Sequence, residues 1–232
     1  MIDITITSTL RPDVLEETLI SFKTKLFNEG DYRIIINIDP VGNKKVTQDD
    51  VESVVRKHFD DVIVNKPVTA NFSKALIWCW SQCESKYVFN LEDDWTLNKT
   101  VDINELKHLL ETNDNLASIR LNKRNNTETM KGVKYSQKFN HIIGKHRYDS
   151  FSLNPSIIKK EFIDACLKGM IGNTNPETQL RDRKCSLYEK VISKWDYAVY
   201  GNFGDKSLIV DIGSKWRCDR GLTNKKKNWT TW

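Results

Sequence analysis

The stretch KYVFNLEDDWTL (residues 86–97) joins a short apolar run to three consecutive acids. The apolar run predicts a buried strand over residues 87–91, which places Glu92, Asp93 and Asp94 at the rim of a sheet. Carboxylates crowded at such a rim are costly unless a cation lies between them. An acidic triplet taken alone is more often a solvated turn than a site, so its interpretation depends on the rest of the chain.

Strand and helix patterns alternate through the first 91 residues. The predicted strands cover residues 2–7, 33–38, 61–64 and 87–91, and the first is expected to be half-buried because its apolar residues alternate. The predicted helices cover residues 13–30, a segment capped by Thr47, and residues 71–84. In the first helix, Asp13 and Glu16 form an expected capping box and Gly30 the expected end. This order predicts an α/β fold, with a Rossmann-type, mostly parallel sheet and helices on both faces.

Polar side chains follow three of the four predicted strands. Ligands of such sheets bind beyond the carboxyl ends of the strands, so these side chains are candidates for one site. They are Thr7, Ser8, Thr9 and Arg11 after the first strand, Asp39 in a turn after the second, and the acidic triplet after the fourth.

The second half of the chain is less regular. We expect helices at 103–112 and 158–168 and one starting at Asn175-Pro176-Glu177, where Asn175 is the N-cap. Strands are expected at 117–121, 197–200 and 207–212, with an extended segment at 148–155. Residues 122–147 are polar and basic and are interpreted as an insertion containing a hairpin. A single domain is therefore predicted over residues 1–213, followed by a tail over residues 214–232.

The charge of the chain is concentrated in this tail. The net charge is +5, and residues 214–232 alone contain six basic residues against one acid, interleaved with three tryptophans. Such a tail suits a polyanion or an anionic surface, and a solvated chain end is the alternative. The five cysteines lack metal-site spacing, and the sequence shows neither a signal peptide nor a long apolar span. We therefore expect reduced thiols and a cytoplasmic location.

The first loop restricts the nucleotide chemistry. Residues 7–12 contain no glycine, and no Walker-type motif occurs in the chain, which argues against dinucleotide and P-loop binding. A bound diphosphate would need another source of positive charge. A divalent cation held by Glu92 and Asp94 would supply it, and oxygen ligands suit Mg²⁺ or Mn²⁺.

These features resemble the GT-A class of nucleotide-sugar glycosyltransferases. The matching features are the Thr-Ser-Thr-x-Arg loop, Asp39, the acid-x-acid at the end of a strand, the Asn-Pro-Glu at residues 175–177 and the segment DIGSKWR at residues 211–217. The resemblance implies that residues 1–97 bind the nucleotide sugar and residues 98–213 the acceptor. In this class the first loop and Asp39 contact the nucleoside. The acid-x-acid holds a metal on the diphosphate, with Asp211 at the position of a late ligand that is often His.

The resemblance also assigns roles to individual residues. Glu177 would be the general base of an inverting transfer, although an acid that complements the helix dipole is the alternative. Asp93 is expected either to support the metal ligands from behind or to face the sugar. The remaining expected contacts are Lys74, Lys215 and Arg217 with the departing diphosphate, and Trp95, Arg220, Lys225, Lys226 and Lys227 with the acceptor. For Trp95, packing in the core is expected first, and a shelf under a sugar ring is the alternative.

The favoured acceptor is double-stranded DNA that carries hydroxymethylated cytosine. The chain resembles phage enzymes that glycosylate such bases in its size, its Lys-, Asn- and Ile-rich composition and its basic tail. Lipopolysaccharide or another surface glycan is the first alternative, because anionic lipid surfaces also attract basic tails. A non-catalytic nucleic-acid-binding protein and a nucleotidyltransferase are further alternatives.

Overall fold

The computed structural model describes residues 1–123, 134–136, 141–144, 151–201 and 206–219. The first half of the chain alternates strands and helices as the sequence predicts. Its elements are β1 (Ile2–Leu10), α1 (Pro12–Lys25), β2 (Tyr32–Gly42), α2 (Gln48–Arg56), β3 (Val62–Asn65), α3 (Phe72–Ser81) and β4 (Tyr87–Glu92).

The second half adds further strands and helices around this unit. They are β5 (Trp95–Leu97), α4 (Ile103–Glu111), β6 (Leu116–Leu121), β7 (Lys134–Ser136), β8 (His141–Gly144), β9 (Ser156–Lys159) and α5 (Lys160–Leu167). The chain continues with α6 (Pro176–Arg181), α7 (Ser186–Lys190), a 3₁₀ turn η2 (Ile192–Lys194), β10 (Asp196–Tyr200), β11 (Ile209–Asp211) and α8 (Gly213–Asp219).

The main sheet has the order β3-β2-β1-β4-β9-β6-β10-β8-β7, and a small second sheet pairs β11 with β5. All main-sheet strands except β8 and β9 run in one direction, so the described sheet is mostly parallel. The chain passes from β1 to β2 and β3 on one side and then returns to β4 on the other. The carboxyl ends of β1 and β4 therefore flank a topological switch point, where α/β sheets bind ligands.

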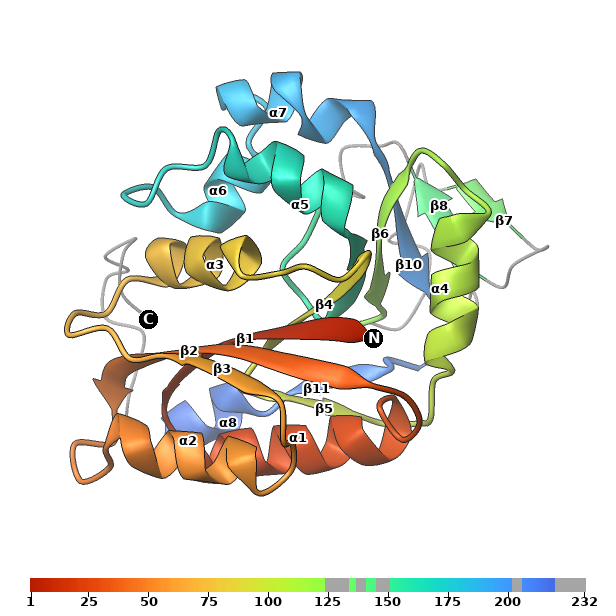
Figure 1. Ribbon diagram of the computed structural model, residues 1–232. Coiled ribbons are helices and arrows are strands. Elements are labelled where there is room, and N and C mark those ends of the chain that lie inside the picture. Colours follow the sequence, from red (N-terminus) through yellow and green to blue (C-terminus); the bar gives the residue numbers. More distant parts are fainter. Residues whose placement is uncertain (124–133, 137–140, 145–150, 202–205, 220–232) are drawn as a thin grey trace.

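Helices cover both faces of this sheet (Figure 1). One core lies between the sheet and α1, α2 and α4, and the other between the sheet and α3, α5, α6 and α7. The β1 strand is buried at every residue, so the predicted half-buried alternation is wrong. Its polar residues are enclosed because β1 is central and has helices on both sides.

Several predicted boundaries are corrected by local geometry. The α1 helix starts with Pro12 at its first position and has no side-chain cap, so the Asp13–Glu16 capping box is absent. It ends at Lys25, and Gly30 lies in the following loop with φ +117°. The β2 strand continues to Gly42, which places Asp39 inside the strand rather than in a turn.

The β9 strand is missed by the sequence prediction. Residues 156–159 form a four-residue strand between β4 and β6 and antiparallel to both, where a helix from residue 158 is expected. The tail prediction also changes, because its first residues form α8. The side-chain caps Thr47 and Asn175 and the β7–β8 hairpin are confirmed. Among the described residues, no helix has the length and apolar character needed to cross a bilayer.

Candidate active site at the switch point

Asp93 joins the carboxyl ends of β1 and β4. Its side chain is completely buried, and its Oδ2 accepts hydrogen bonds from Ser8 Oγ at 3.0 Å and from the Thr9 amide at 2.9 Å. The Thr18 hydroxyl donates to its backbone oxygen at 2.9 Å. Asp93 thus holds the first loop against the acidic turn. Its buried carboxylate positions this loop and offers no surface to a sugar.

Arg11 supplies the cation that the acidic turn requires. Its guanidinium forms an ion pair with Asp93, and its Nη1 lies 3.3 Å from Asp94 Oδ2. The side chain is only 7% exposed, and the Trp216 ring lies over it, with 5.6 Å between the guanidinium carbon and the ring centroid. Its Nε has no hydrogen-bond partner among the described residues. For Arg11 to contact the nucleotide as predicted, Trp216 would have to move away from the guanidinium, or the nucleotide would have to reach the Arg11 Nε.

Asp94 lies under the start of α8. The Ile212 amide donates to its backbone oxygen at 2.9 Å, and Arg217 Nη1 lies 3.8 Å from Oδ2. A Cβ added to Gly213 would lie 2.0 Å from the same carboxylate oxygen, so only glycine fits here. Burial, reinforced by Asp93, raises the pKa of Asp94, and the opposing effect of Arg11 does not cancel this rise.

Glu92 is the third acid of the turn and is held by Trp95, whose Nε1 donates to Oε2 at 3.0 Å. Burial raises the pKa of Glu92 above its ordinary range, and the negative charges of Asp94 and Glu177 raise it further. Glu177 therefore lies within electrostatic reach of the acidic turn, although the two are far apart in sequence.

Asp211 reaches the same place from the small sheet, where it pairs with Trp95 across the β5–β11 ladder. It accepts a hydrogen bond from the Ser214 amide at 3.1 Å, and Lys123 Nζ lies 3.5 Å from its Oδ2. Its charge also raises the pKa of Asp94. The structure thus brings the predicted late ligand to the predicted early ones.

This donor set fits a divalent cation. Glu92, Asp94 and Asp211 are hard oxygen donors, and burial together with the neighbouring acids raises the pKa values of Glu92 and Asp94, so a cation bound there would favour their charged forms. Among the residues that the structure describes, no three His, Cys, Asp or Glu side chains are placed so that they could hold a metal ion together. Loading a cation would therefore require these carboxylates to reorient.

Other predicted residues are spread along the same edge. Thr7, Ser8 and Thr9 are buried, and so is Asp39, whose carboxylate accepts from Asn37 Nδ2 at 2.8 Å and from the Asn71 amide at 2.9 Å. Asp39 thus holds the start of α3. Lys74 and Lys215 are exposed, and Arg217 is 38% exposed.

Glu177 lies in the first turn of α6, is 48% exposed and pairs with Arg181 at 3.8 Å. Trp95 is only 3% exposed, so it packs under the site instead of providing a shelf for a sugar ring. Arg220, Lys225, Lys226 and Lys227 lie outside the described residues.

Three residues at the site were not predicted to act there. Lys123 follows β6 and lies over the Trp95 ring at 4.4 Å, Gly213 makes room for Asp94, and Trp216 covers Arg11 and donates to Asp13 Oδ2 at 3.1 Å. Gly213 and Trp216 belong to the segment DIGSKWR, which resembles the GT-A class, although this resemblance assigns no role to either residue. Lys123 carries no local signal.

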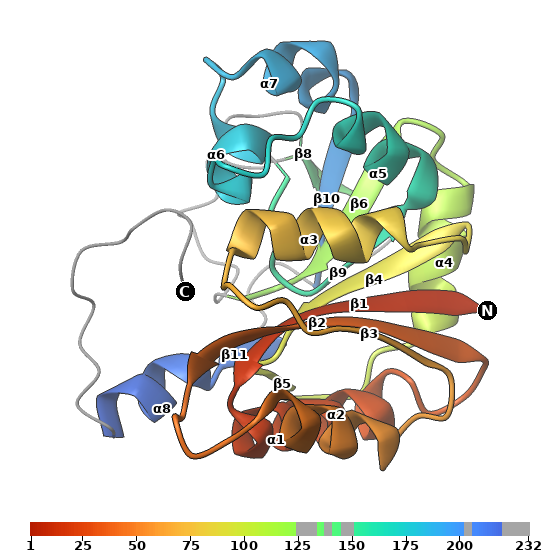
Figure 2. The same ribbon diagram turned by 60° about the vertical axis from the view of Figure 1, so that its left-hand side comes forward.

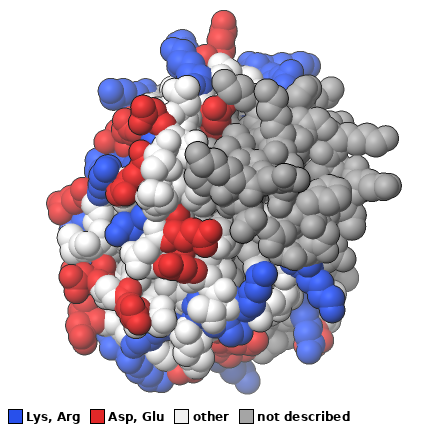
Figure 3. Space-filling model, turned by 90° about the vertical axis from the view of Figure 1, so that its right-hand side faces the viewer, with Lys and Arg blue, Asp and Glu red and all other residues white. Residues whose placement is uncertain are grey.

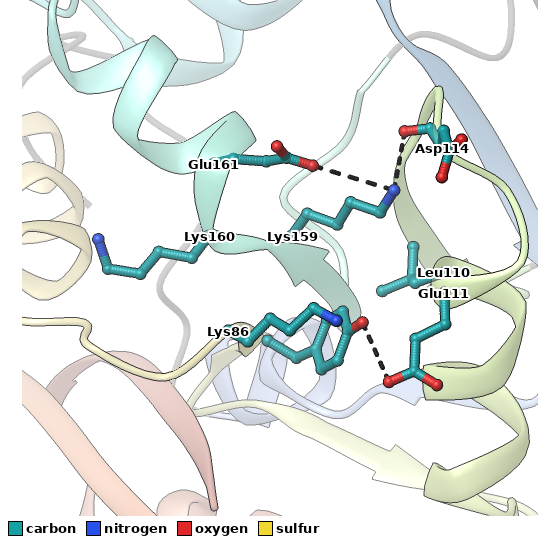
Figure 4. A pocket seen from close by; sticks show the side chains of 8 residues that line it. Lys86, Leu110, Glu111, Asp114, Lys159, Lys160 and Glu161 are labelled. Carbon is teal, nitrogen blue, oxygen red and sulfur yellow. Dashed lines mark hydrogen bonds and ion pairs between the residues drawn. The ribbon is translucent and has the colours of Figure 1, made fainter.

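A charged cavity of about 300 Å³ lies at the opposite, amino edge of the sheet (Figure 4). Lys159 Nζ donates there to the backbone oxygens of Asn113 at 3.0 Å and Asp114 at 2.8 Å, and Tyr87 pairs with Glu111. These groups are used in holding β9 to the end of α4. The cavity is separate from the carboxylate site and is not a candidate for its chemistry.

Comparison with known proteins shows the fold but no sequence relative. Neither a protein-family model nor a curated protein matches the sequence. Residues 1–349 of S. aureus TarS in complex with UDP-GlcNAc align with a TM-score of 0.59 and 13% identity, over 90% of this chain and 58% of that one. Mannosyltransferase PcManGT from Pyrobaculum calidifontis, in complex with GDP-Man and Mn²⁺, aligns with a TM-score of 0.58 and 10% identity, over 87% and 54%.

The present chain therefore spans little more than half the length of these two structures. Identities of 10–13% establish a shared fold alone. The predicted fold class, a single α/β domain with a mostly parallel sheet of GT-A type, is confirmed.

Proposed function

We propose that the chain is a metal-dependent glycosyltransferase that moves a hexosyl or pentosyl group from a UDP-sugar, or a similar nucleotide sugar, to an acceptor hydroxyl. The observation that carries this proposal is the set of three carboxylates, Glu92, Asp94 and Asp211, around the switch point of the sheet, where Asp211 lies opposite Trp95 in the small sheet and Arg11 lies 3.3 Å from Asp94. The shared fold with structures described with UDP-GlcNAc, or with GDP-Man and Mn²⁺, supports it.

Glu92, Asp94 and Asp211 would hold Mn²⁺ or Mg²⁺, which, when bound, supplies positive charge to the departing diphosphate. Thr7, Ser8, Thr9, Arg11 and Asp39 form the nucleoside side of the site. Lys74, Lys215 and Arg217 are exposed cations at its border and would neutralise the diphosphate further. Asp93 keeps the first loop in position through its buried hydrogen bonds.

Glu177 would be the general base. Its half-exposed carboxylate would accept the proton of the acceptor hydroxyl while the acceptor oxygen forms a bond to the anomeric carbon. The bond from that carbon to the diphosphate oxygen breaks on the opposite face, and the nucleoside diphosphate leaves with the electron pair, which gives inversion. The negative charge of Glu177 contributes to the raised pKa of Glu92, which supports a position within electrostatic reach of the proposed metal ligands.

The acceptor is proposed from surface chemistry. DNA with hydroxymethylated cytosine is proposed because of the basic tail. The tail residues beyond Asp219 lie outside the described structure. A surface glycan is favoured instead by the described carboxyl edge, which presents aliphatic side chains as well as lysines.

Thermal unfolding with UDP, GDP and Mn²⁺ tests the donor half of this proposal. We expect UDP to raise the melting temperature only when Mn²⁺ is present, because the diphosphate needs the cation. Incubation with a panel of UDP-sugars, offering hydroxymethylated DNA, plain DNA and lipid-linked glycans, then tests transfer through release of UDP. The absence of both metal-dependent stabilisation and UDP release would exclude the glycosyltransferase.

A further inference from the structure

Two neighbouring loops at the carboxyl edge of the sheet hold aliphatic side chains in solvent. Val68, between β3 and α3, is 94% exposed, and Ile171, between α5 and α6, is 59% exposed. A single exposed aliphatic residue is ordinary on a protein surface, so the inference depends on how these two residues are held and what surrounds them.

The loop of Ile171 is fixed by a buried glutamine. Gln179 is 1% exposed, and its amide accepts from the Ile171 backbone N–H at 2.7 Å and donates to the backbone oxygens of Ile171 at 2.9 Å and Thr174 at 2.6 Å. The amide is therefore satisfied by the loop backbone alone. The loop has a defined conformation, and this conformation directs Ile171 outward.

The loop that contains Val68 is also fixed, and it is joined to the loop of Ile171. Gln48 Nε2 donates to the Pro67 backbone oxygen at 3.0 Å, which fixes the residue before Val68. At the other end of this loop, α3 begins, and Ser73 Oγ donates to the Thr174 backbone oxygen at 2.6 Å. The two loops are thus joined through the start of α3 and project at the same end of the molecule, on the left in Figure 1.

The surrounding loops are basic. Residues 43–47, 66–71 and 168–175 contain four lysines and no acid, and the nearest acids along the chain are Asp49 and Asp50 at the start of α2 and Glu177 at the start of α6. Lys66 is paired with Asp49 and Glu52, whereas Lys44, Lys45 and Lys168 are exposed. On the amino-edge face, by contrast, acidic and basic side chains are interspersed over the described surface (Figure 3).

We propose that the rim formed by Val68, Ile171, Lys44, Lys45 and Lys168 docks on an anionic lipid bilayer. Lysines attract the phosphate headgroups, while two aliphatic side chains enter the boundary between headgroups and acyl chains. Proteins that bind single-stranded nucleic acid instead pair their cations with aromatic stacking platforms, which Val68 and Ile171 do not provide.

Docking in this way turns the edge that carries the carboxylate site toward the membrane. This orientation, which rests on the proposed function, makes a glycan or lipid at the membrane surface the acceptor.

Vesicle sedimentation with the full-length chain, without donor or metal, tests the rim. Vesicles of phosphatidylcholine with about one-third phosphatidylglycerol are compared with vesicles of phosphatidylcholine alone. We expect binding to the anionic vesicles only, and a loss of about tenfold or more in the Val68→Asp/Ile171→Asp variant, because two inserted side chains are replaced by anions.

The matched control is Ile20→Asp, which introduces an anion at a 48% exposed side chain of α1 away from the rim and is compared with each single rim variant, Val68→Asp and Ile171→Asp. It should bind like the wild type. Equal binding by the rim variant and the wild type would overturn the proposal, as would binding that depends only on residues 220–232. Failure of UDP and Mn²⁺ to stabilise the protein would refute the glycosyltransferase instead and leave the vesicle result unaffected.

Discussion

Replacement of Gly213 by alanine tests whether α8 is built around Asp94. The new Cβ would lie 2.0 Å from Asp94 Oδ2, and ordinary contact begins at 3.4 Å, so one of the two groups must move by about 1.4 Å. Asp94 is held from the other side by Arg11, and its backbone is bonded to Ile212. We therefore expect α8 to lift or the carboxylate to rotate, at a cost of about 1–3 kcal/mol in the free energy of unfolding.

Helix propensity alone predicts the opposite change, an increase in the free energy of unfolding. Alanine is more favourable than glycine in a helix by up to about 1 kcal/mol, and Gly213 has no positive φ that would penalise it. The sign of the change measured by urea unfolding shows which effect is larger, and we expect a net loss of about 0–2 kcal/mol after a propensity gain of about 1 kcal/mol is subtracted. Asp94 is a proposed metal ligand, and a Cβ at position 213 would occupy the space of its carboxylate, so the UDP- and Mn²⁺-dependent rise in melting temperature should also disappear.

Gly172→Ala is the control, because its Cβ would meet the flexible Lys74 side chain at 3.1 Å, and a small shift of that side chain relieves the contact. It should leave the stability nearly unchanged. A Gly213→Ala protein that is more stable than the wild type and keeps its metal-dependent response would refute the packing of α8 on Asp94.

Three further predictions concern the carboxylates. Asp94→Asn should abolish the Mn²⁺-dependent shift in melting temperature caused by UDP while the protein remains folded, and an unchanged shift would remove Asp94 from the metal site. Without metal, stability should fall as the pH rises from about 4 toward neutrality, because the raised pKa values of Glu92 and Asp94 mean that the folded state holds protons that the unfolded chain releases. A series of melting curves against pH would show this, with a smaller slope in Glu92→Gln. Glu177→Gln should bind UDP and Mn²⁺ normally but lose transfer by about a hundredfold or more, and near-normal turnover would exclude it as the base.

Much of the fold follows from local signals. The helical spacing of Phe72, Leu76 and Trp80 and the caps Thr47 and Asn175 act over a few residues, so the sequence predicts these helices. The β9 strand is different, because four residues before a helix carry too little periodicity to be separated from it. Only pairing with β4 and β6 makes that segment a strand.

The candidate site is likewise predictable only where the signal is local. The acids of the turn and the polar first loop are predicted because both follow strands, and the switch point brings them together. The partners that decide their chemistry come from far along the chain, as Arg11 with Asp93 and Gly213 with Asp94 show. Sequence alone predicts that a cation is needed at the acidic turn, but not that an arginine of the same chain already provides part of it.

The position of β9 also sets an order for assembly of the sheet. Strands β3, β2, β1 and β4 are neighbours within the first 92 residues and are joined by short right-handed units, so this block can form from local connections. The far edge of β4 stays open until residues 156–159 arrive, more than sixty positions later in the chain. An open strand edge is a template for pairing with another molecule, so the nascent chain has an interval in which the half that carries the acidic turn is formed but unprotected.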